Sequence, residues 1–180
     1  MPMYTGCNKT ALCSQKSIAE AFVSLLHEKE YSKISVSEIC EKAAVSRQTF
    51  YSLFKAKENI VAFELSKKYL FNPNEECKCT GRPSLRELSK AYARFISDKS
   101  DFINLLVKNN IIYLMQEGLY ECFLECIRKD DNWESDLAAD FLAAGLSTIA
   151  KHYVANESAI TDSELEEIIY DLFTGKIYLE

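Results

Sequence analysis

A stretch of polar and basic side chains at residues 46–57 carries groups that can read DNA. Arginine and glutamine side chains make paired hydrogen bonds with guanine and adenine edges in the major groove, and Arg47 and Gln48 are neighbours. Hydroxyl and ammonium groups, such as those of Tyr51 and Lys55, hold phosphates and set the register of a protein on the duplex. These residue types predict recognition of double-stranded DNA.

Two short helices joined by a tight turn are needed to position these side chains. Ser35 and Glu38 form a capping box that starts the first helix. Ser46 is expected to cap the second helix, over about residues 47–53. Because a longer amphipathic helix, roughly residues 11–30, precedes the pair, the arrangement is that of a helix-turn-helix.

The second short helix has one apolar side for the core and one polar side for DNA. Phe50 and Phe54 are expected to face inward. A further helix is predicted to start near Lys57. The helix N-termini at Ser35 and Lys57 add amide donors and the positive end of a helix dipole for phosphate groups.

The charge distribution agrees with DNA binding although the net charge is −6. Residues 1–60 hold 8 Lys and Arg against 6 Asp and Glu, whereas residues 61–180 hold 13 against 21. Between Glu41 and Glu58 there are four basic residues and no acidic one. A phosphate backbone would meet this local basic patch rather than the acidic remainder.

The composition favours an all-α fold. The 180 residues include 5 Gly and 3 Pro, so long stretches run without turn signals. The clearest linker is 72–83. Without a visible secretory signal or membrane span, the 7 Cys are expected to be reduced thiols, in a cytoplasmic protein with no membrane partner. Apolar periodicity predicts the remaining helices over about 84–97, 101–109, 111–128, 134–156 and 162–174.

The segment from Ile34 to Ile60, ISVSEICEKAAVSRQTFYSLFKAKENI, resembles the DNA-binding domain of the tetracycline-repressor (TetR) family. That family reads Thr/Ser-Val-x-Asp/Glu-Ile-Ala, then Gly-Val-Ser, Thr-Leu/Phe-Tyr-x-x-Phe and Lys-x-Lys-Glu-x-Leu/Ile. The match covers about residues 10–68. It implies an all-α fold with an N-terminal three-helix helix-turn-helix domain, 10–68, followed by a helical C-terminal regulatory and dimerisation domain, 69–180.

The same resemblance assigns roles to single residues. Arg47, Gln48 and Thr49 would face the bases. The residues that would mainly hold the DNA backbone are Ser37, Ser46, Tyr51, Ser52, Lys55 and Lys57.

Two positions depart from the family pattern. Ala44 occupies the turn position usually held by Gly, where the expected left-handed conformation costs roughly 1 kcal/mol more than with Gly. Ser37 stands where relatives often carry Arg, which removes one base contact and leaves the operator sequence open.

In the TetR family the C-terminal domain binds an inducer and dimerises, usually through the last two helices, here 134–156 and 162–174. The resemblance implies a homodimer, since reading two half-sites requires a two-fold axis. The apolar stripe of the last helix comprises Leu165, Ile168, Ile169, Leu172 and Phe173. The alternative is that the apolar stripes of both helices belong to the core of the monomer. The expected interface residues are Leu137, Phe141, Ala144, Gly145, Thr148, Leu165, Ile169 and Leu172.

The effector is expected to be a small molecule or a protein. The short C-terminal domain, with Gly in its penultimate helix, resembles a subgroup related to dihydroxyacetone-kinase regulators, which implies a protein partner. Aromatic side chains can also line an inducer pocket, although at helical spacing each is by default a core residue. These aromatics are Tyr92, Phe95, Phe102, Tyr113, Tyr120, Phe123 and Trp133.

The cysteines supply an alternative hypothesis, a protein-interaction or a redox- or metal-sensing regulator. Cys77 and Cys79 lie in the predicted linker, and Cys122 and Cys126 are four residues apart on one helix. Such pairs can bind metal or sense oxidants. Because two-Cys clusters without a nearby His or third Cys are weak metal sites, no metal ion and no cofactor are predicted.

Enzymatic function is not supported by any motif. The sequence has no Gly-rich phosphate loop, no nucleophile elbow and no His-Glu-x-x-His helix, and His27 and His152 lie in different helices. We therefore expect a repressor that occupies a near-palindromic operator as a homodimer and is released by an effector. The sequence does not distinguish a repressor from an activator.

Overall fold

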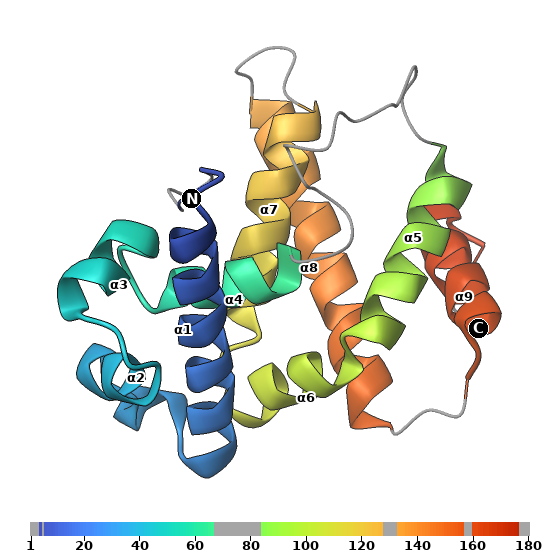
Figure 1. Cartoon of the computed structure of the whole chain (residues 1–180). Coiled ribbons are helices and arrows are strands. Elements are labelled where there is room, and N and C mark those ends of the chain that lie inside the picture. The colour runs from blue at the N-terminus through green and yellow to red at the C-terminus, as the bar shows by residue number, and fades with distance from the viewer. Residues whose placement is uncertain (1–3, 5, 67–83, 128–132, 157–159, 177–180) are drawn as a thin grey trace.

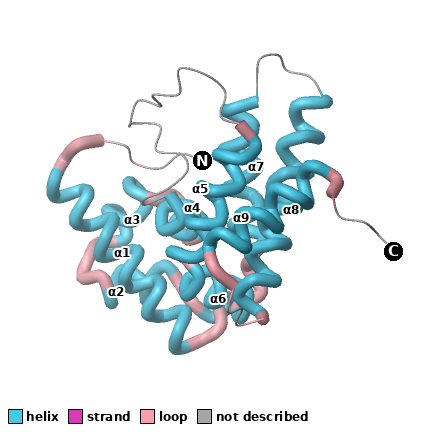
Figure 2. Tube along the Cα trace, turned by 90° about the vertical axis from the view of Figure 1, so that its right-hand side faces the viewer, coloured by secondary structure: helices cyan, strands magenta, loops and turns pink. Residues whose placement is uncertain are grey.

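The computed structural model describes residues 4, 6–66, 84–127, 133–156 and 160–176, and all regular structure in these ranges is helical (Figures 1 and 2). The predicted all-α class is therefore confirmed. We call α1–α4 the reading head. Its elements are α1 (Lys9–Glu28), the 3₁₀ turn η1 (Tyr31–Lys33), α2 (Val36–Lys42), α3 (Arg47–Leu53) and α4 (Glu58–Ser66).

The remaining helices form a second unit, which we call the body. In Figure 1 α7 and α8 stand at the centre, with the reading head on one side and α5 with α9 on the other. α7 packs against α8, α5 against α9, and α6 against α8. The predicted linker, 72–83, lies outside the described residues. The helices of the body are α5 (Leu85–Asp98), α6 (Ser100–Lys108), α7 (Tyr113–Ile127), α8 (Trp133–Ala155) and α9 (Asp162–Thr174).

Side-chain caps start the helices at the predicted residues. The Ser35 hydroxyl accepts from the Glu38 amide, and the Glu38 carboxylate accepts from the Ser35 amide at 2.9 Å, so the capping box of α2 is complete. Ser46 caps α3 by accepting from the Thr49 amide at 3.0 Å. A capping box at Ser84 starts α5, at the beginning of the helix predicted over about 84–97. These local bonds satisfy amides that the first helical turn leaves without partners.

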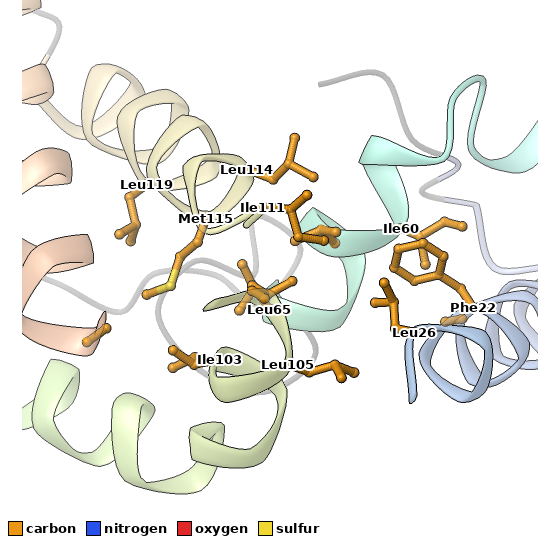
Figure 3. Packing of buried hydrophobic residues seen from close by; sticks show 14 of the residues in the cluster. Phe22, Leu26, Ile60, Leu65, Ile103, Leu105, Ile111, Leu114, Met115 and Leu119 are labelled. Atoms are coloured by element: carbon orange, nitrogen blue, oxygen red, sulfur yellow. The ribbon is translucent and has the colours of Figure 1, made fainter. Parts of the chain in front are cut away.

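One hydrophobic core runs through both units. Phe22 and Leu26 of α1 and Ile60 of α4 lie on the reading-head side, and they belong to the same cluster as Ile111, between α6 and α7, and Leu114 of α7 (Figure 3). The continuity means that the reading head is held by the body through packed side chains. Among the described residues, no helix combines the length and the apolar composition needed to cross a membrane.

Candidate nucleic-acid interface

The inner side of α3 is anchored in the core. Phe50 and Phe54 are fully buried, as predicted, and their ring centroids lie 6.0 Å apart. Phe54 also makes an edge-to-face contact with Phe63 of α4, with centroids 5.4 Å apart. Aromatic pairs of this geometry stabilise a helix beyond the area they bury. They fix which side of α3 faces outward.

The outer side of α3 is polar and open to solvent. Tyr51 is 46 % exposed, and its ring leans on the edge of Phe50 at 5.4 Å between centroids. Thr49 and Lys57 are half-buried. The other eight of the ten expected DNA-contacting residues are exposed, namely Ser35, Ser37, Ser46, Arg47, Gln48, Tyr51, Ser52 and Lys55. Contact of all ten residues with DNA stays a prediction.

The turn before α3 contains the left-handed residue that the sequence analysis expected. Ala44 has φ 54°, and its amide donates to the Glu41 carbonyl at 3.1 Å. The Val45 amide then donates to the Cys40 carbonyl at 3.0 Å, which closes the end of α2. Lys55, after α3, has φ 59°, and no sequence signal indicated this second left-handed position.

Hydroxyl groups of α3 also bond within the helix. Ser46 Oγ lies 2.8 Å from Thr49 Oγ1, and Ser52 Oγ donates to the Thr49 carbonyl at 2.8 Å. These bonds give the hydroxyl groups of Ser46, Thr49 and Ser52 local partners, whereas Arg47 and Gln48 stay exposed.

The exposed positive charge is smaller than the four basic residues indicated. Lys42 pairs with Glu28 of α1 at 2.5 Å. The Lys57 ammonium donates to the Tyr31 and Ile34 carbonyls at 3.1 and 3.0 Å. Within the described part of the chain, Arg47 and Lys55 form no ion pair and are exposed, and they supply the charge that a phosphate would meet first.

Tyr31 connects η1 to the start of α4. Its hydroxyl donates to Glu58 Oε1 at 2.6 Å, and the Lys57 ammonium lies 3.9 Å from its ring centroid. Burial and the Glu58 carboxylate raise the pKa of the Tyr31 phenol. Lys57 therefore has an intramolecular role that the family resemblance did not indicate, and its phosphate contact stays a prediction.

A second exposed surface lies on α8 and α9 and is apolar. Leu137 and Phe141 of α8 are 58 % and 67 % exposed, and Ile168 and Leu172 of α9 are 42 % and 44 % exposed. We call these four residues the apolar face. Large side chains grouped in this way mark a surface for association.

Leu165 and Ile169, two of the expected interface residues, are core residues of the single chain, and their role in a dimer stays a prediction. They are 2 % and 1 % exposed in the single chain, because α9 packs this side against α5. The Arg86 guanidinium of α5 fixes that orientation. It donates to Glu167 at 2.5 Å and stacks over the Tyr170 ring at 3.8 Å.

The small residues of α8 serve packing within the chain as well. A Cβ at Gly145 would meet the Phe173 ring at 3.4 Å, so the glycine lets α9 lie close to α8. Ala144 is half-buried and Thr148 is exposed beside it. Their interface role stays a prediction.

A small cavity lies in the body between α5, α7, α8 and α9. Its volume is about 50 Å³, and its walls are almost entirely apolar. Tyr92, which lines it, is 2 % exposed and its hydroxyl has no hydrogen-bond partner among the described residues. Tyr92, Phe95 and Phe123 are core residues, whereas Tyr113 is exposed. The Trp133 side chain lies outside the described part of the structure.

The cysteine hypothesis gains no support from the described residues. Cys40 is buried, which raises the pKa of its thiol, and Cys122 is half-buried. Cys77, Cys79 and the side chain of Cys126 lie outside the described residues. Within the ranges that are described, no group of three or more His, Cys, Asp or Glu side chains is placed to hold a metal ion.

Comparison with known proteins identifies a family for the N-terminal part of the chain and a relative for most of its length. Residues 18–62 match the family of bacterial regulatory proteins described as the tetR family. Over 168 residues the chain is 39 % identical to the HTH-type dhaKLM operon transcriptional activator DhaS of Lactococcus lactis subsp. lactis (strain IL1403). That match covers 89 % of this chain and 87 % of the relative.

Two solved structures share the fold. Lin0861 from Listeria innocua has a TM-score of 0.67 at 13 % identity, with 98 % of this chain and 97 % of that chain covered. The dihydroxyacetone kinase operon activator DhaS has a TM-score of 0.53 at 21 % identity, with 91 % and 96 % covered. The expected resemblance to the TetR family, and within it to regulators related to dihydroxyacetone kinase, is confirmed.

Proposed function

The chain belongs to the tetR family of bacterial regulatory proteins, and from this premise we propose that it binds a near-palindromic operator as a homodimer through α3. The family and the related L. lactis protein are transcriptional regulators and not enzymes, so the chain is a transcriptional regulator. As an operator-binding protein it acts on DNA in the cytoplasm. In this proposal residues 10–68 form the DNA-binding domain, and residues 69–180 form the domain for dimerisation and effector response.

One observation carries the proposal: α3 presents Arg47, Gln48 and Tyr51 to solvent while Phe50 is fixed in the core. A helix lying in the major groove requires this division between an anchored side and a polar side. Arg47 and Gln48 are in the first turn of α3, and residues near the N-terminus of a recognition helix contact base edges.

The apolar face supports the homodimer. Phe141 of α8 lies against Phe173 of α9 with ring centroids 6.4 Å apart, so the two helices form one surface. Pairing that surface with its copy around a two-fold axis would make a four-helix contact and bury the exposed rings and leucines. In this arrangement the interface residues of α9 are Ile168 and Leu172.

Two directions of regulation are candidates. Repression by operator occupancy was the sequence-based expectation. The 39 % identical L. lactis protein is named a transcriptional activator, which favours activation for this chain. A reporter gene behind the native promoter distinguishes them, because deletion of an activator lowers reporter expression and deletion of a repressor raises it.

We propose that the effector acts on the body and is a protein. The cavity of about 50 Å³ is far below the roughly 300–1,000 Å³ of pockets for drug-sized ligands. The wider hollow of about 490 Å³ between α1 and α4 is open to solvent. If cell extract changes operator affinity, protease treatment of the extract should abolish the change, and a protease-resistant change would contradict a protein effector.

Selection of bound fragments from native genomic DNA, at a low and a higher salt concentration, tests the proposed function. We expect recovery of a near-palindrome whose half-sites lie about one helical turn, roughly 34 Å, apart. Binding should weaken steeply with salt, because phosphate contacts release counterions. A matched variant with Arg47→Ala and Gln48→Ala should recover no palindrome. Equal recovery by both proteins would contradict reading by α3.

A further inference from the structure

The side chain of Asn109, at the end of α6, bonds to the reading head. Asn109 Oδ1 accepts from the Tyr31 amide at 3.0 Å, and its Nδ2 donates to the Leu26 carbonyl at 3.4 Å. Both backbone groups lie where α1 ends and η1 begins, where a helix leaves amides and carbonyls without partners. One side chain therefore satisfies two such groups on another unit of the molecule.

The other end of α6 is also attached to the reading head. The Lys99 ammonium donates to the Glu64 carbonyl of α4 at 2.6 Å. The residues at both ends of α6 thus hold different helices of the reading head.

These bonds lie between the proposed dimer contact and α3. α6 packs against α8, which carries half of the apolar face, and α1 packs against α3. The position and orientation of α3 relative to the two-fold axis of the proposed dimer therefore depend on how α1 and α4 are held against α6. Leu26, Leu105 and Ile111 pack in this region (Figure 3), and the hydrogen bonds to backbone groups add a directional constraint to that packing.

We propose that Asn109 and Lys99 are positioning residues that set the separation of the two reading heads, and thereby the half-site spacing that the dimer accepts. This inference rests on the proposed operator binding by a homodimer. Neither side chain reads a base. Their effect is on the geometry of two heads together, so a single half-site should not sense them.

The test compares three kinds of DNA with the full-length chain: the selected operator, the operator with one or two base pairs inserted between half-sites, and one isolated half-site. Asn109→Ala should lower affinity for the intact operator by about five- to tenfold, on the order of one hydrogen bond. It should also reduce the penalty for inserted base pairs, and leave half-site affinity unchanged. Lys99→Met should act in the same direction.

Asn156→Ala is the matched control. Asn156 directly follows α8 and its Nδ2 donates to the His152 carbonyl at 2.9 Å, just as Nδ2 of Asn109, which directly follows α6, donates to the Leu105 carbonyl at 3.0 Å. The two variants lose the same bond within a helix, but only Asn109→Ala loses bonds to the reading head. Asn156→Ala should keep the spacing penalty of the unmodified chain.

Two results would overturn the inference. One is an unchanged spacing penalty in both Asn109→Ala and Lys99→Met. The other is an equal loss of affinity for the operator and the half-site, which indicates general damage to the reading head. Failure of the unmodified chain to bind any operator would instead contradict the proposed function itself, and this inference with it.

Discussion

The outward side of α3 and the apolar face of α8 and α9 are both exposed in the single chain, but they differ in chemistry. α3 presents charged and hydrogen-bonding groups, with Tyr51 46 % exposed. The apolar face presents Phe141 at 67 % and Leu137 at 58 %. Polar side chains can remain in water until DNA arrives, whereas exposed large apolar groups gain free energy by being covered. The comparison predicts reversible binding at α3 and constitutive association at the apolar face.

The largest expected effect comes from placing a charge in the apolar face. Phe141→Glu should convert a dimer into a monomer, because the carboxylate would be buried without a partner. Operator affinity should fall by about 100-fold or more, since two linked heads bind far better than one. Sedimentation velocity measures the oligomeric state.

Leu12→Glu is the control for this change. Leu12 is an exposed apolar residue of α1, 46 % exposed and outside the apolar face. Its variant should sediment as the unmodified chain does. A Phe141→Glu variant that remained dimeric would remove the apolar face from the account.

The two sides of α9 provide a second contrast. Leu165→Ala should lower the free energy of unfolding by about 2–5 kcal/mol, because it leaves a cavity in the core. Ile168→Ala should change that free energy little and weaken the dimer instead. Chemical denaturation of each variant combined with Phe141→Glu, which removes the contribution of dimerisation, measures the free energy of unfolding, and sedimentation velocity of Ile168→Ala alone measures dimerisation. Similar losses for the two residues would contradict the assignment of the α9 sides.

Ala44 offers a smaller effect within the reading head. Ala44→Gly should raise the free energy of unfolding by about 1 kcal/mol, because Gly adopts the φ of 54° without a Cβ clash. Thermal unfolding followed by circular dichroism measures the gain. A loss of stability would show that the entropy Gly adds to the unfolded chain outweighs the relieved strain.

The smallest effect concerns the capping box of α2 and depends on pH. Hydrogen bonds from Lys29 and from the Ser35 amide and hydroxyl lower the pKa of Glu38 to about 2, from its ordinary 4.5. Because the folded pKa is the lower one, the stabilisation is present above about 4.5 and is lost as pH falls towards about 2. The stability difference between the unmodified chain and Glu38→Gln should shrink over that window.

Glu87→Gln in the body is the comparison for Glu38→Gln. The pKa of Glu87 is lowered by the Ser84 amide and hydroxyl, without an ion pair. Its variant should therefore show a smaller difference over the same pH window. Denaturant titrations across that window measure both, and an equal or larger difference for Glu87→Gln would contradict the contribution of Lys29.

The reading head could be predicted largely from its sequence because its determinants are local. The caps at Ser35 and Ser46 act within three residues, and the inward positions of Phe50 and Phe54 follow from helical spacing. The left-handed φ at Ala44 followed from a family position. What escaped prediction was the inward turn of the Lys57 ammonium, since its acceptors lie 23 and 26 residues away.

The body was less predictable because periodicity defines stripes but not their partners. Leu165 and Ile168 belong to the same apolar pattern of α9, yet contact with α5 buries the first and leaves the second exposed. Asn109 was not singled out at all, since its partners in the reading head lie 78 and 83 residues away. Such contacts become visible only when the helices are placed in space.

Operator affinity measured against salt concentration, for the unmodified chain and for the double variant Gln48→Ala with Tyr51→Ala, tests the central claim most directly. We predict an affinity loss of at least about tenfold, from one base contact and one phosphate contact. The salt dependence should also become shallower, because fewer counterions are released. Unchanged affinity together with unchanged salt dependence would show that α3 does not read the DNA.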